Sequence, residues 1–563
     1  MAPVNVKRAV SAFSVYSKKN VVKKKKKLDV LKKDNKRLEV PNQDTLEDIS
    51  IITKRQSSAN TDSLKSKRKK KKKISNRTIE LEERDGDENN EEDTAVSDQY
   101  LEKTNGHEES ENMGSIEEGK IMFEWLVHPL RFDEFMKDPW EKRPYHGQRN
   151  NPSYYSAVLS TEMIDKMLRK HNVKFTKNID VTTYSDGVRE TLNPPGRATA
   201  ERVWAYYENG CSVRLLNPQS FIPQVGMMVA TLQELFGCMV GANVYLTPPD
   251  SQGFAPHYDD IEAFVMQIEG KKHWRVYSPR SEKEVLPRFS SQNLTQEELG
   301  EPLLDVVLTA GDILYFPRGF IHQANTVPGE HSLHITLSSY QRHSWADILE
   351  KMLPAALSVA TEETVDFRRG LPVDYLQYMG VAHSDKTGDE RREAFITQLH
   401  QLFDKLWEHL PIDAAVDQMA KEFMHDAFPP VLTEEEVKQT VTGGGLRMLS
   451  DGKISKDTKL QLTTKIKLLR AHILRLVMED DNDEDNDDED TVDIFHYADN
   501  SMEYHGEDPQ SFKISADLAP GVEFLISCYP QFVSISDIPL DTDSEKINLA
   551  SDLWQRGLLL KCD

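Results

Sequence analysis

Short runs rich in β-branched and aromatic residues dominate the hydrophobic pattern between Val213 and Tyr340. They include residues 242–246, 263–268, 274–277 and 333–337, and Gly, Pro and Asp separate them. Many short strands with such punctuation favour a small barrel or a double-sheet jelly roll.

A helical period replaces this pattern after Trp345. Residues 346–357 and 391–410 carry apolar side chains at three- and four-residue spacing, which predicts two helices. Such helices suit a bundle on the flank of the barrel or a dimer seam, and ordinary core packing explains the spacing equally well. Upstream of the barrel, aromatic density begins near Ile121, and residues 163–168 suggest a short helix.

The last section, from about residue 430 to 563, mixes helix and strand. An almost wholly acidic stretch at 479–490 interrupts it and predicts a solvated loop. A helix expected over 544–556 leads into the strand-like residues 558–560. Helices followed by paired strands suit a winged-helix module.

The first 118 residues form a tail of different composition. The chain has 563 residues and a net charge of −23, yet this tail holds the basic runs 23–27 and 67–73, followed by an acidic patch at 80–93. Blocks of like charge predict disorder. The basic runs favour nuclear and nucleolar targeting, with RNA or chromatin as a partner, over a merely solvated tail.

Cysteine usage and hydropathy predict a soluble intracellular protein. The four cysteines form no CxxC pair, which argues against structural zinc and a disulfide framework. No apolar stretch approaches the roughly 18 residues of a membrane span, and the N-terminus lacks the apolar core of a secretory signal. We therefore expect no membrane partner.

Three residues have the spacing of a metal site. His257 and Asp259 precede a β run, and positions i and i+2 of a strand point to the same face, so that Tyr258 faces away. His322 follows a Gly-Asp turn, a β run and a Pro-Arg-Gly bend. Two His and one carboxylate form the facial triad of non-haem Fe(II) oxygenases, which leaves positions open for a keto acid and O2. Zinc is the alternative metal.

A keto-acid co-substrate also needs a cation for its distal carboxylate. Residues 269–274 are interpreted as a turn into the next strand, in which Lys272, Trp274 and Val276 share a face. Lys272 is the candidate carboxylate partner. The nearby His334 is expected to pack or to form a hydrogen bond within the barrel rather than to bind metal.

The combination of HYDD, GKKHWRVY and GDILYFPRGFIHQA resembles the JmjC-type oxygenases and, more narrowly, the ribosomal oxygenases. The similarity extends from Phe123 to the C-terminus. It implies a mixed α+β chain with a JmjC (cupin jelly-roll) double-stranded β-helix at 119–345, a helical dimerisation domain at 346–428 and a winged-helix-like domain at 429–563.

The resemblance also implies roles for individual residues. The iron ligands and catalytic residues are His257, Asp259 and His322. Lys272 contacts 2-oxoglutarate, with Asn243, Tyr245 and Thr336 as pocket neighbours. The positions similar to the family's substrate groove are Arg214, Tyr245, Asn293 and Ser338.

The implied reaction is hydroxylation of a protein side chain by Fe(II), 2-oxoglutarate and O2. A histidine of a ribosomal protein is the first expected substrate, and methyl-lysine of histone H3, in chromatin and transcription regulation, is the second. A homodimer in the nucleolus and nucleoplasm is expected. The alternative is a non-catalytic JmjC adaptor that binds chromatin or ribosomal RNA, although an intact ligand set favours catalysis.

Overall fold

The computed structural model describes residues 113–185, 188–251, 255–455, 459–477, 491–503 and 510–562. Residues 1–112 of the predicted tail and the acidic stretch at 479–490 lie outside these ranges, whereas residues 115–118, which were expected to belong to the tail, are helical. In the part of the chain that is described, no helix is both long enough and apolar enough to span a bilayer.

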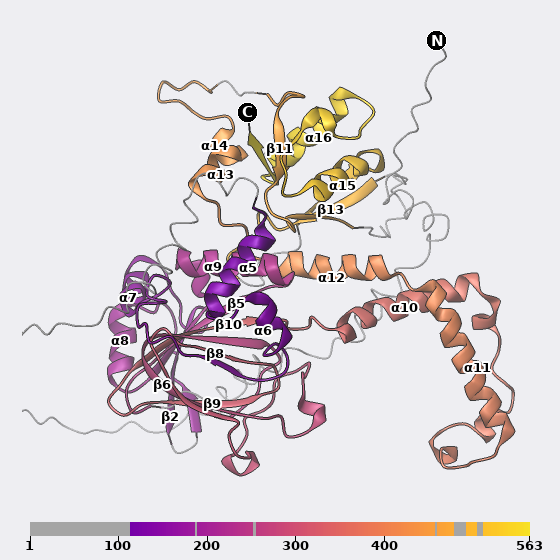
Figure 1. Ribbon diagram of the computed structural model, residues 1–563, viewed down its shortest axis with the longest axis horizontal. Helices are drawn as coiled ribbons and strands as arrows, with labels where there is room; N and C mark the ends of the chain where they lie inside the picture. Colours follow the sequence, from indigo (N-terminus) through magenta and orange to yellow (C-terminus); the bar gives the residue numbers. More distant parts are fainter. Residues whose placement is uncertain are drawn as a thin grey trace, which may run out of the picture.

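An N-terminal group of helices covers one face of the barrel (Figure 1). The helices are α5 (Ser115–Val127), α6 (Phe132–Lys137), α7 (Thr161–Lys170), α8 (Ala200–Glu208) and α9 (Pro223–Phe236). Helix α5 begins at Ser115, a few residues before the tail boundary expected from charge. The buried ring of Phe123 explains why α5 packs here, since it lies 5.1–5.7 Å from Phe132, Phe135, Phe236 and Phe264, edge-on to each.

The predicted barrel is confirmed as a double-stranded β-helix. Its strands are β1 (Tyr145–Gly147), β2 (Ile179–Ser185), β3 (Val188–Thr191), β4 (Ser212–Leu216), β5 (Gly241–Thr247), β6 (Glu262–Tyr277), β7 (Leu304–Thr309), β8 (Ile313–Phe316), β9 (Ile321–Thr326) and β10 (Ser332–Ser339). Eight follow the order β1-β8-β6-β10-β5-β4-β2-β3, while β7 and β9 pair with β6.

Strand β6 corrects the turn predicted at residues 269–274. The chain runs on through 16 residues as one strand, and Gly270 absorbs the bend with a φ of +65°. A Cβ at Gly270 would lie 1.9 Å from the carbonyl oxygen of His331, so the close approach of the two chains requires glycine. The first half of β6 pairs with β8 and β10, and the second half with β7 and β9. The strand therefore joins both layers of the barrel.

Two hydrophobic clusters lie on opposite faces of this wall. Phe264, Met266 and Ile268 face the core under the N-terminal helices. Ala263 and Val265 face the interior, where a smaller cluster contains Trp274. Along the second half of β6, Lys272, Trp274 and Val276 are buried while Lys271, His273 and Arg275 are half-exposed, which confirms the predicted alternation. Tyr277, the last residue of the strand, is also buried.

The helical middle region forms an arm beside the barrel (Figure 1). It consists of α10 (Trp345–Glu363), α11 (Glu390–Leu406) and α12 (Ile412–Asp426), which confirms both helices predicted from the apolar spacing. A capping box of Ser344 and Asp347 fixes the start of α10.

The C-terminal domain combines short helices with two three-stranded sheets, ordered β15-β11-β16 and β12-β13-β14. Its elements are α13 (Glu434–Gln439), α14 (Val441–Gly444), β11 (Lys465–Leu468), β12 (Leu474–Val477), β13 (Thr491–His496), β14 (Gln510–Ser515), α15 (Ala519–Cys528), β15 (Val533–Ser534), α16 (Asp543–Gln555) and β16 (Leu559–Cys562). The predicted final helix and strand are confirmed as α16 and β16.

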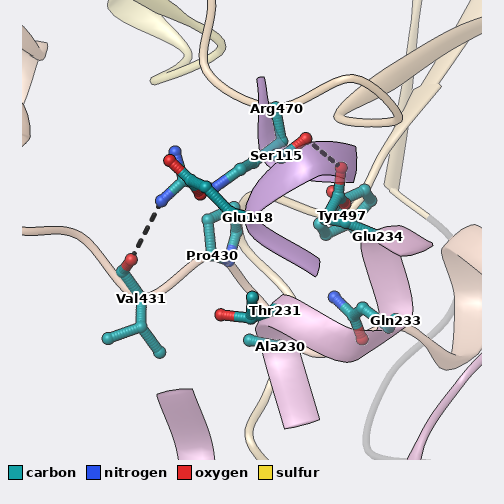
Figure 2. A pocket seen from close by; sticks show the side chains of 10 residues that line it. All are labelled: Ser115, Glu118, Ala230, Thr231, Gln233, Glu234, Pro430, Val431, Arg470 and Tyr497. Atoms are coloured by element: carbon teal, nitrogen blue, oxygen red, sulfur yellow. Dashed lines mark hydrogen bonds between the residues drawn. The ribbon is translucent and has the colours of Figure 1, made fainter. Parts of the chain in front are cut away.

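A buried polar cluster joins this domain to the barrel (Figure 2). Glu234 of α9 accepts hydrogen bonds from the hydroxyls of Ser115 (2.8 Å) and Tyr497. Arg470 lies beside them and donates to Glu436 at 2.5 Å. A cavity of about 20 Å³ adjoins the cluster, which is room for about one water. Because these charges are buried, breaking one pair is expected to loosen the domain contact.

Candidate metal centre

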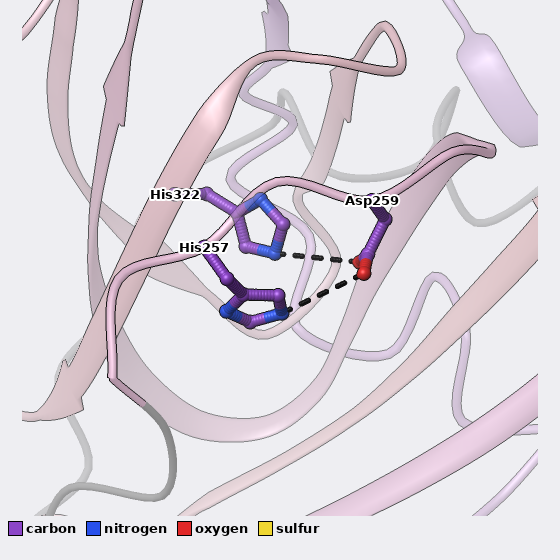
Figure 3. Close-up of side chains that lie close together, drawn as sticks. All are labelled: His257, Asp259 and His322. Carbon is purple, nitrogen blue, oxygen red and sulfur yellow. Dashed lines mark ion pairs between the residues drawn. The ribbon is translucent and has the colours of Figure 1, made fainter. Parts of the chain in front are cut away.

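His257, Asp259 and His322 converge at the mouth of the barrel (Figure 3). One ligand atom from each lies within 4.8 Å of the others. Both imidazole Nε2 atoms are 3.7 Å from a carboxylate oxygen of Asp259. Backbone hydrogen bonds between His257 and His322, at 3.3 and 2.9 Å, fix the two histidine segments relative to each other.

The other nitrogen of each ring sets its orientation. Nδ1 of His257 is 2.9 Å from the carbonyl oxygen of Ala255, and Nδ1 of His322 is 3.2 Å from that of Phe320. With Nδ1–H donating to a carbonyl, the Nε2 lone pair faces Asp259, as a metal ligand requires. Burial, with the nearby His257, lowers the pKa of His322 to about 4, so that this ring is neutral. The donor set fits a divalent metal with open positions on one side.

Lys272 is a buried cation in the interior of the same barrel. Its residue is 4% exposed, and its Nζ donates to Oγ1 of Thr247 at 3.1 Å. No carboxylate among the described residues pairs with it. Burial lowers the pKa of Lys272 from 10.5 to about 7. A bound carboxylate would stabilise the charged ammonium and offset the free-energy cost of burying it. The side chain therefore suits an anionic ligand.

Strand register brings most of the other predicted site residues together. Thr336 lies opposite Asn243, and Arg214 lies opposite Tyr245. The ring of Tyr245 stacks on that of His334, with centroids 4.9 Å apart. Ser338 continues the same face of β10, since it is two residues beyond Thr336. These side chains form one continuous wall.

Arg214 is held in this wall by a carboxylate. Its Nε and Nη2 donate to one oxygen of Asp180 at 3.2 and 2.5 Å. Burial lowers the pKa of Arg214, but Tyr245 and Asp180 outweigh burial, and the net shift is upward. The guanidinium is therefore fixed and charged.

Asn293 lies apart from this wall, in the connection between β6 and β7. The residue is exposed. Its neighbour Leu294 donates its backbone N–H to the carbonyl oxygen of Pro256 at 2.8 Å. Asn293 is therefore placed beside the metal-ligand segment by backbone contacts rather than by its own side chain.

Sequence reasoning missed Thr247 as the partner of Lys272, and it expected His334 only to pack or to form a hydrogen bond within the barrel. Strand alternation could have indicated Thr247, because it lies on the same face of β5 as Asn243 and Tyr245. His334 is 2% exposed and lies edge-on to Trp274, with centroids 5.5 Å apart. His334 Nδ1 and Trp274 Nε1 are buried polar atoms without a hydrogen-bond partner in the described chain. Their position beside Lys272 marks an interior suited to a polar ligand.

Two family models match the chain. The model of the JmjC domain matches residues 214–348, which include all the site residues predicted from the sequence. The model described as the C-terminal winged helix domain of Ribosomal oxygenase 1 matches residues 428–562. The predicted winged-helix module is therefore confirmed.

Several curated proteins are similar over most of the chain. One, from Culex quinquefasciatus, is named Bifunctional lysine-specific demethylase and histidyl-hydroxylase NO66; it is 50% identical over 452 residues, covering 80% of this chain and 68% of the relative. Ribosomal oxygenase 1 of Danio rerio is 50% identical over 442 residues, covering 78% and 79%. Ribosomal oxygenase 1 of Gallus gallus is 52% identical over 438 residues, covering 78% and 71%.

Among solved structures, the ribosomal oxygenase YcfD from Escherichia coli, in complex with cobalt and 2-oxoglutarate, is 14% identical with a TM-score of 0.39. The match covers 77% of this chain and 99% of YcfD.

Proposed function

Because the chain belongs to the ribosomal oxygenase family of JmjC proteins, we propose that it is an Fe(II)- and 2-oxoglutarate-dependent oxygenase of protein side chains. One observation carries the proposal: the His257–Asp259–His322 cluster lies on a barrel whose interior holds the buried ammonium group of Lys272, which pairs with no carboxylate of the described residues. An adaptor would have no use for this arrangement.

Each residue has a distinct role in this proposal. His257, Asp259 and His322 hold the iron, and Lys272 with Thr247 binds the distal carboxylate of 2-oxoglutarate. Asn243, Tyr245 and Thr336 line the co-substrate pocket. Arg214, Tyr245, Asn293 and Ser338 orient the substrate. When bound, iron, 2-oxoglutarate and O2 supply the oxidation, in which one oxygen atom enters a C–H bond and the keto acid becomes succinate and CO2.

The barrel contributes exclusion of water and a fixed ligand geometry. Leu308, Leu314 and Phe316 pack beside Trp274 in the interior cluster. The ring of Phe316 lies 4.4 Å from that of His322, so this apolar cluster limits access of water on the His322 side of the site. Arg214 and Tyr245 fix the groove side, so that the target C–H bond approaches from one direction.

We propose a histidine of a ribosomal protein as the first substrate and methyl-lysine of histone H3 as the second. The names of the curated relatives, which include histidyl-hydroxylase and lysine-specific demethylase, support both. The two products differ: a hydroxylated histidine is stable, whereas a hydroxylated N-methyl group is lost as formaldehyde.

Mass spectrometry of the two peptide classes tests the proposal. After incubation with Fe(II) and 2-oxoglutarate, the wild-type protein should add one oxygen to histidine in a ribosomal-protein peptide or remove a methyl group from a histone H3 peptide. His257→Ala should do neither. His273→Ala is a matched control, because His273 lies on β6 with its ring against Asp305. Retained 2-oxoglutarate turnover in His257→Ala would refute the assigned metal site.

The middle helices support a proposed homodimer. Large apolar side chains on this arm are exposed in the single chain, among them Trp345 (84%), Phe403 (66%) and Trp407 (73%). Exposed apolar side chains of this size suit burial against a second copy. Sedimentation of the wild-type protein beside Phe403→Glu tests this, since the variant should be monomeric.

The N-terminal tail supports proposed nuclear and nucleolar localisation. The basic runs 23–27 and 67–73 have the composition of targeting segments and of RNA or chromatin contacts. Replacing the lysines and arginine of run 67–73 by glutamine should shift a fluorescently tagged chain out of the nucleolus.

A further inference from the structure

The connection between β6 and β7 contains a segment that braces the metal-ligand residues from outside. We define this bracing segment as residues 288–294. Its backbone N–H groups at Ser291 and Leu294 donate to the carbonyl oxygens of Tyr258 and Pro256, at 2.9 and 2.8 Å. The hydroxyl of Ser291 also accepts the N–H of Tyr258 at 2.9 Å.

A second contact reinforces this pairing at Asp260. Ser290 Oγ accepts the backbone N–H of Asp260 at 3.2 Å and donates to its carboxylate at 2.7 Å. On the other side, the ligand segment pairs with His322 through backbone bonds. Residues 256–260, which carry two of the three proposed metal ligands, are therefore clamped between β9 and the bracing segment.

The bracing segment is in turn fastened to the helical arm by Arg288. Its guanidinium donates to both carboxylate oxygens of Glu350, at 2.6 and 2.7 Å, and to Asp347 at 2.7 Å. Asp347 is 7% exposed and caps the first turn of α10 through Ser344. A two-carboxylate fork of this kind requires arginine, since lysine has no planar donor set.

The bracing segment also includes one of the proposed substrate-groove residues. It carries Asn293, and the ring of Phe289 is 54% exposed with the guanidinium of Arg342 stacked 4.6 Å above it. Gln341, two residues after the end of β10, donates to Asp260 at 3.2 Å. The mouth of the barrel is thus built from the bracing segment and the residues that immediately precede α10.

We propose that Arg288 is a positioning residue for the protein substrate, which couples the first turn of α10 to the bracing segment and so to the rim of the metal site. The inference rests on the proposed function, because it concerns the same groove. In this proposal, the helical arm controls peptide binding through the ion pairs of Arg288 with Glu350 and Asp347.

Amide hydrogen exchange on the metal-free protein tests the coupling directly. In Arg288→Ala, the amides of Ser291 and Leu294 should exchange at least about tenfold faster, because the segment loses its anchor. The amide of His322, which donates to His257 on the opposite side, should be unchanged. If the amides of Ser291 and Leu294 exchange at the same rates in Arg288→Ala as in the wild-type protein, the proposal is overturned.

Kinetics give a second readout that a general loss of stability would not produce. The KM for the peptide modified by the wild-type protein should rise about five- to twentyfold in Arg288→Ala, with peptide-free 2-oxoglutarate turnover within about twofold of wild type. Arg288→Lys should be intermediate. Arg288→Ala and Glu350→Ala combined should cost no more than Arg288→Ala alone, because the Arg288 variant already removes the contact with Glu350.

Lys351→Ala provides the matched control. Lys351 adjoins Glu350 on α10 but pairs with Glu422 of α12, so its loss should leave the peptide KM unchanged. A comparable KM increase in Lys351→Ala, or additive effects of the Arg288 and Glu350 variants, would overturn the proposal. A wild-type protein without 2-oxoglutarate turnover would instead refute the proposed function, and the exchange experiment would still decide the coupling.

Discussion

Lys272→Met is expected to stabilise the free protein while it abolishes co-substrate binding. The ammonium of Lys272 is buried, and Thr247 is a neutral partner that offers little compensation for lost hydration. Methionine has a similar length and no charge, so it fills the same space without that cost. A functional residue that destabilises its own fold is typical of a binding site.

The pKa of Lys272 sets the size of the effect. The interval from 10.5 to about 7, at about 1.4 kcal/mol per pH unit, corresponds to an upper limit of roughly 5 kcal/mol. Relaxation and water penetration reduce such penalties, so we expect Lys272→Met to raise the free energy of unfolding by about 2–4 kcal/mol near neutral pH.

The sign of the pH dependence follows from the same interval. Since the folded-state pKa lies below that of the unfolded chain, the folded protein binds fewer protons between pH 7 and 10.5, and wild-type stability rises with pH there. Below pH 7 the full free-energy cost of burying the charged Lys272 opposes folding. The stability advantage of Lys272→Met should therefore be largest at or below pH 7 and narrow by up to about 1.4 kcal/mol per pH unit above it.

Thermal unfolding of the metal-free proteins between pH 6.5 and 8.5 measures this difference. Lys271→Met is the matched control, because Lys271 points away from the pocket, is 44% exposed at its side chain and pairs with Glu330. With Mn²⁺ present, 2-oxoglutarate should raise the Tm of wild type and of Lys271→Met but not of Lys272→Met. A less stable Lys272→Met that still responds to 2-oxoglutarate would refute the reasoning.

Local patterns predicted the barrel and its wall of site residues. Alternation alone places Lys272, Trp274 and Val276 on one face, and the spacing of His257 and Asp259 suffices to propose two ligands. The error at residues 269–274 arose because Gly270 carries a turn signal. In the fold, this glycine allows the backbone of β6 to lie close to the backbone at His331. His331 is 61 positions away, so a local sequence pattern cannot indicate this contact.

Contacts between distant residues could not be predicted. The hydroxyl of Tyr497 reaches Glu234 across 263 positions, and Arg288 reaches Glu350 across 62. In the sequence each of these is an ordinary polar residue with a solvated surface as its default environment. Their roles depend on how the barrel, the arm and the C-terminal domain pack together. The hydrophobic periodicity within a single helix or strand contains no information about that packing.

Three further variants test particular contacts. Arg470→Ala leaves the carboxylate of Glu436 unpaired at the domain junction and should cost about 2–4 kcal/mol in urea unfolding, with 2-oxoglutarate turnover per folded molecule unchanged; a loss below about 0.5 kcal/mol would contradict a buried pair. Chelation of the metal should lower the Tm of wild type, and added Mn²⁺ should restore it, whereas Asp259→Ala should respond to neither step; a restored Tm in the variant would place the metal elsewhere. Asp180→Asn removes the charge that holds Arg214 against Tyr245 while keeping the shape of the side chain, so the guanidinium becomes free to leave the groove wall. The KM for peptide should rise about three- to tenfold with the KM for 2-oxoglutarate unchanged, and an equal rise in both constants would show that Asp180 supports the barrel as a whole rather than the position of Arg214.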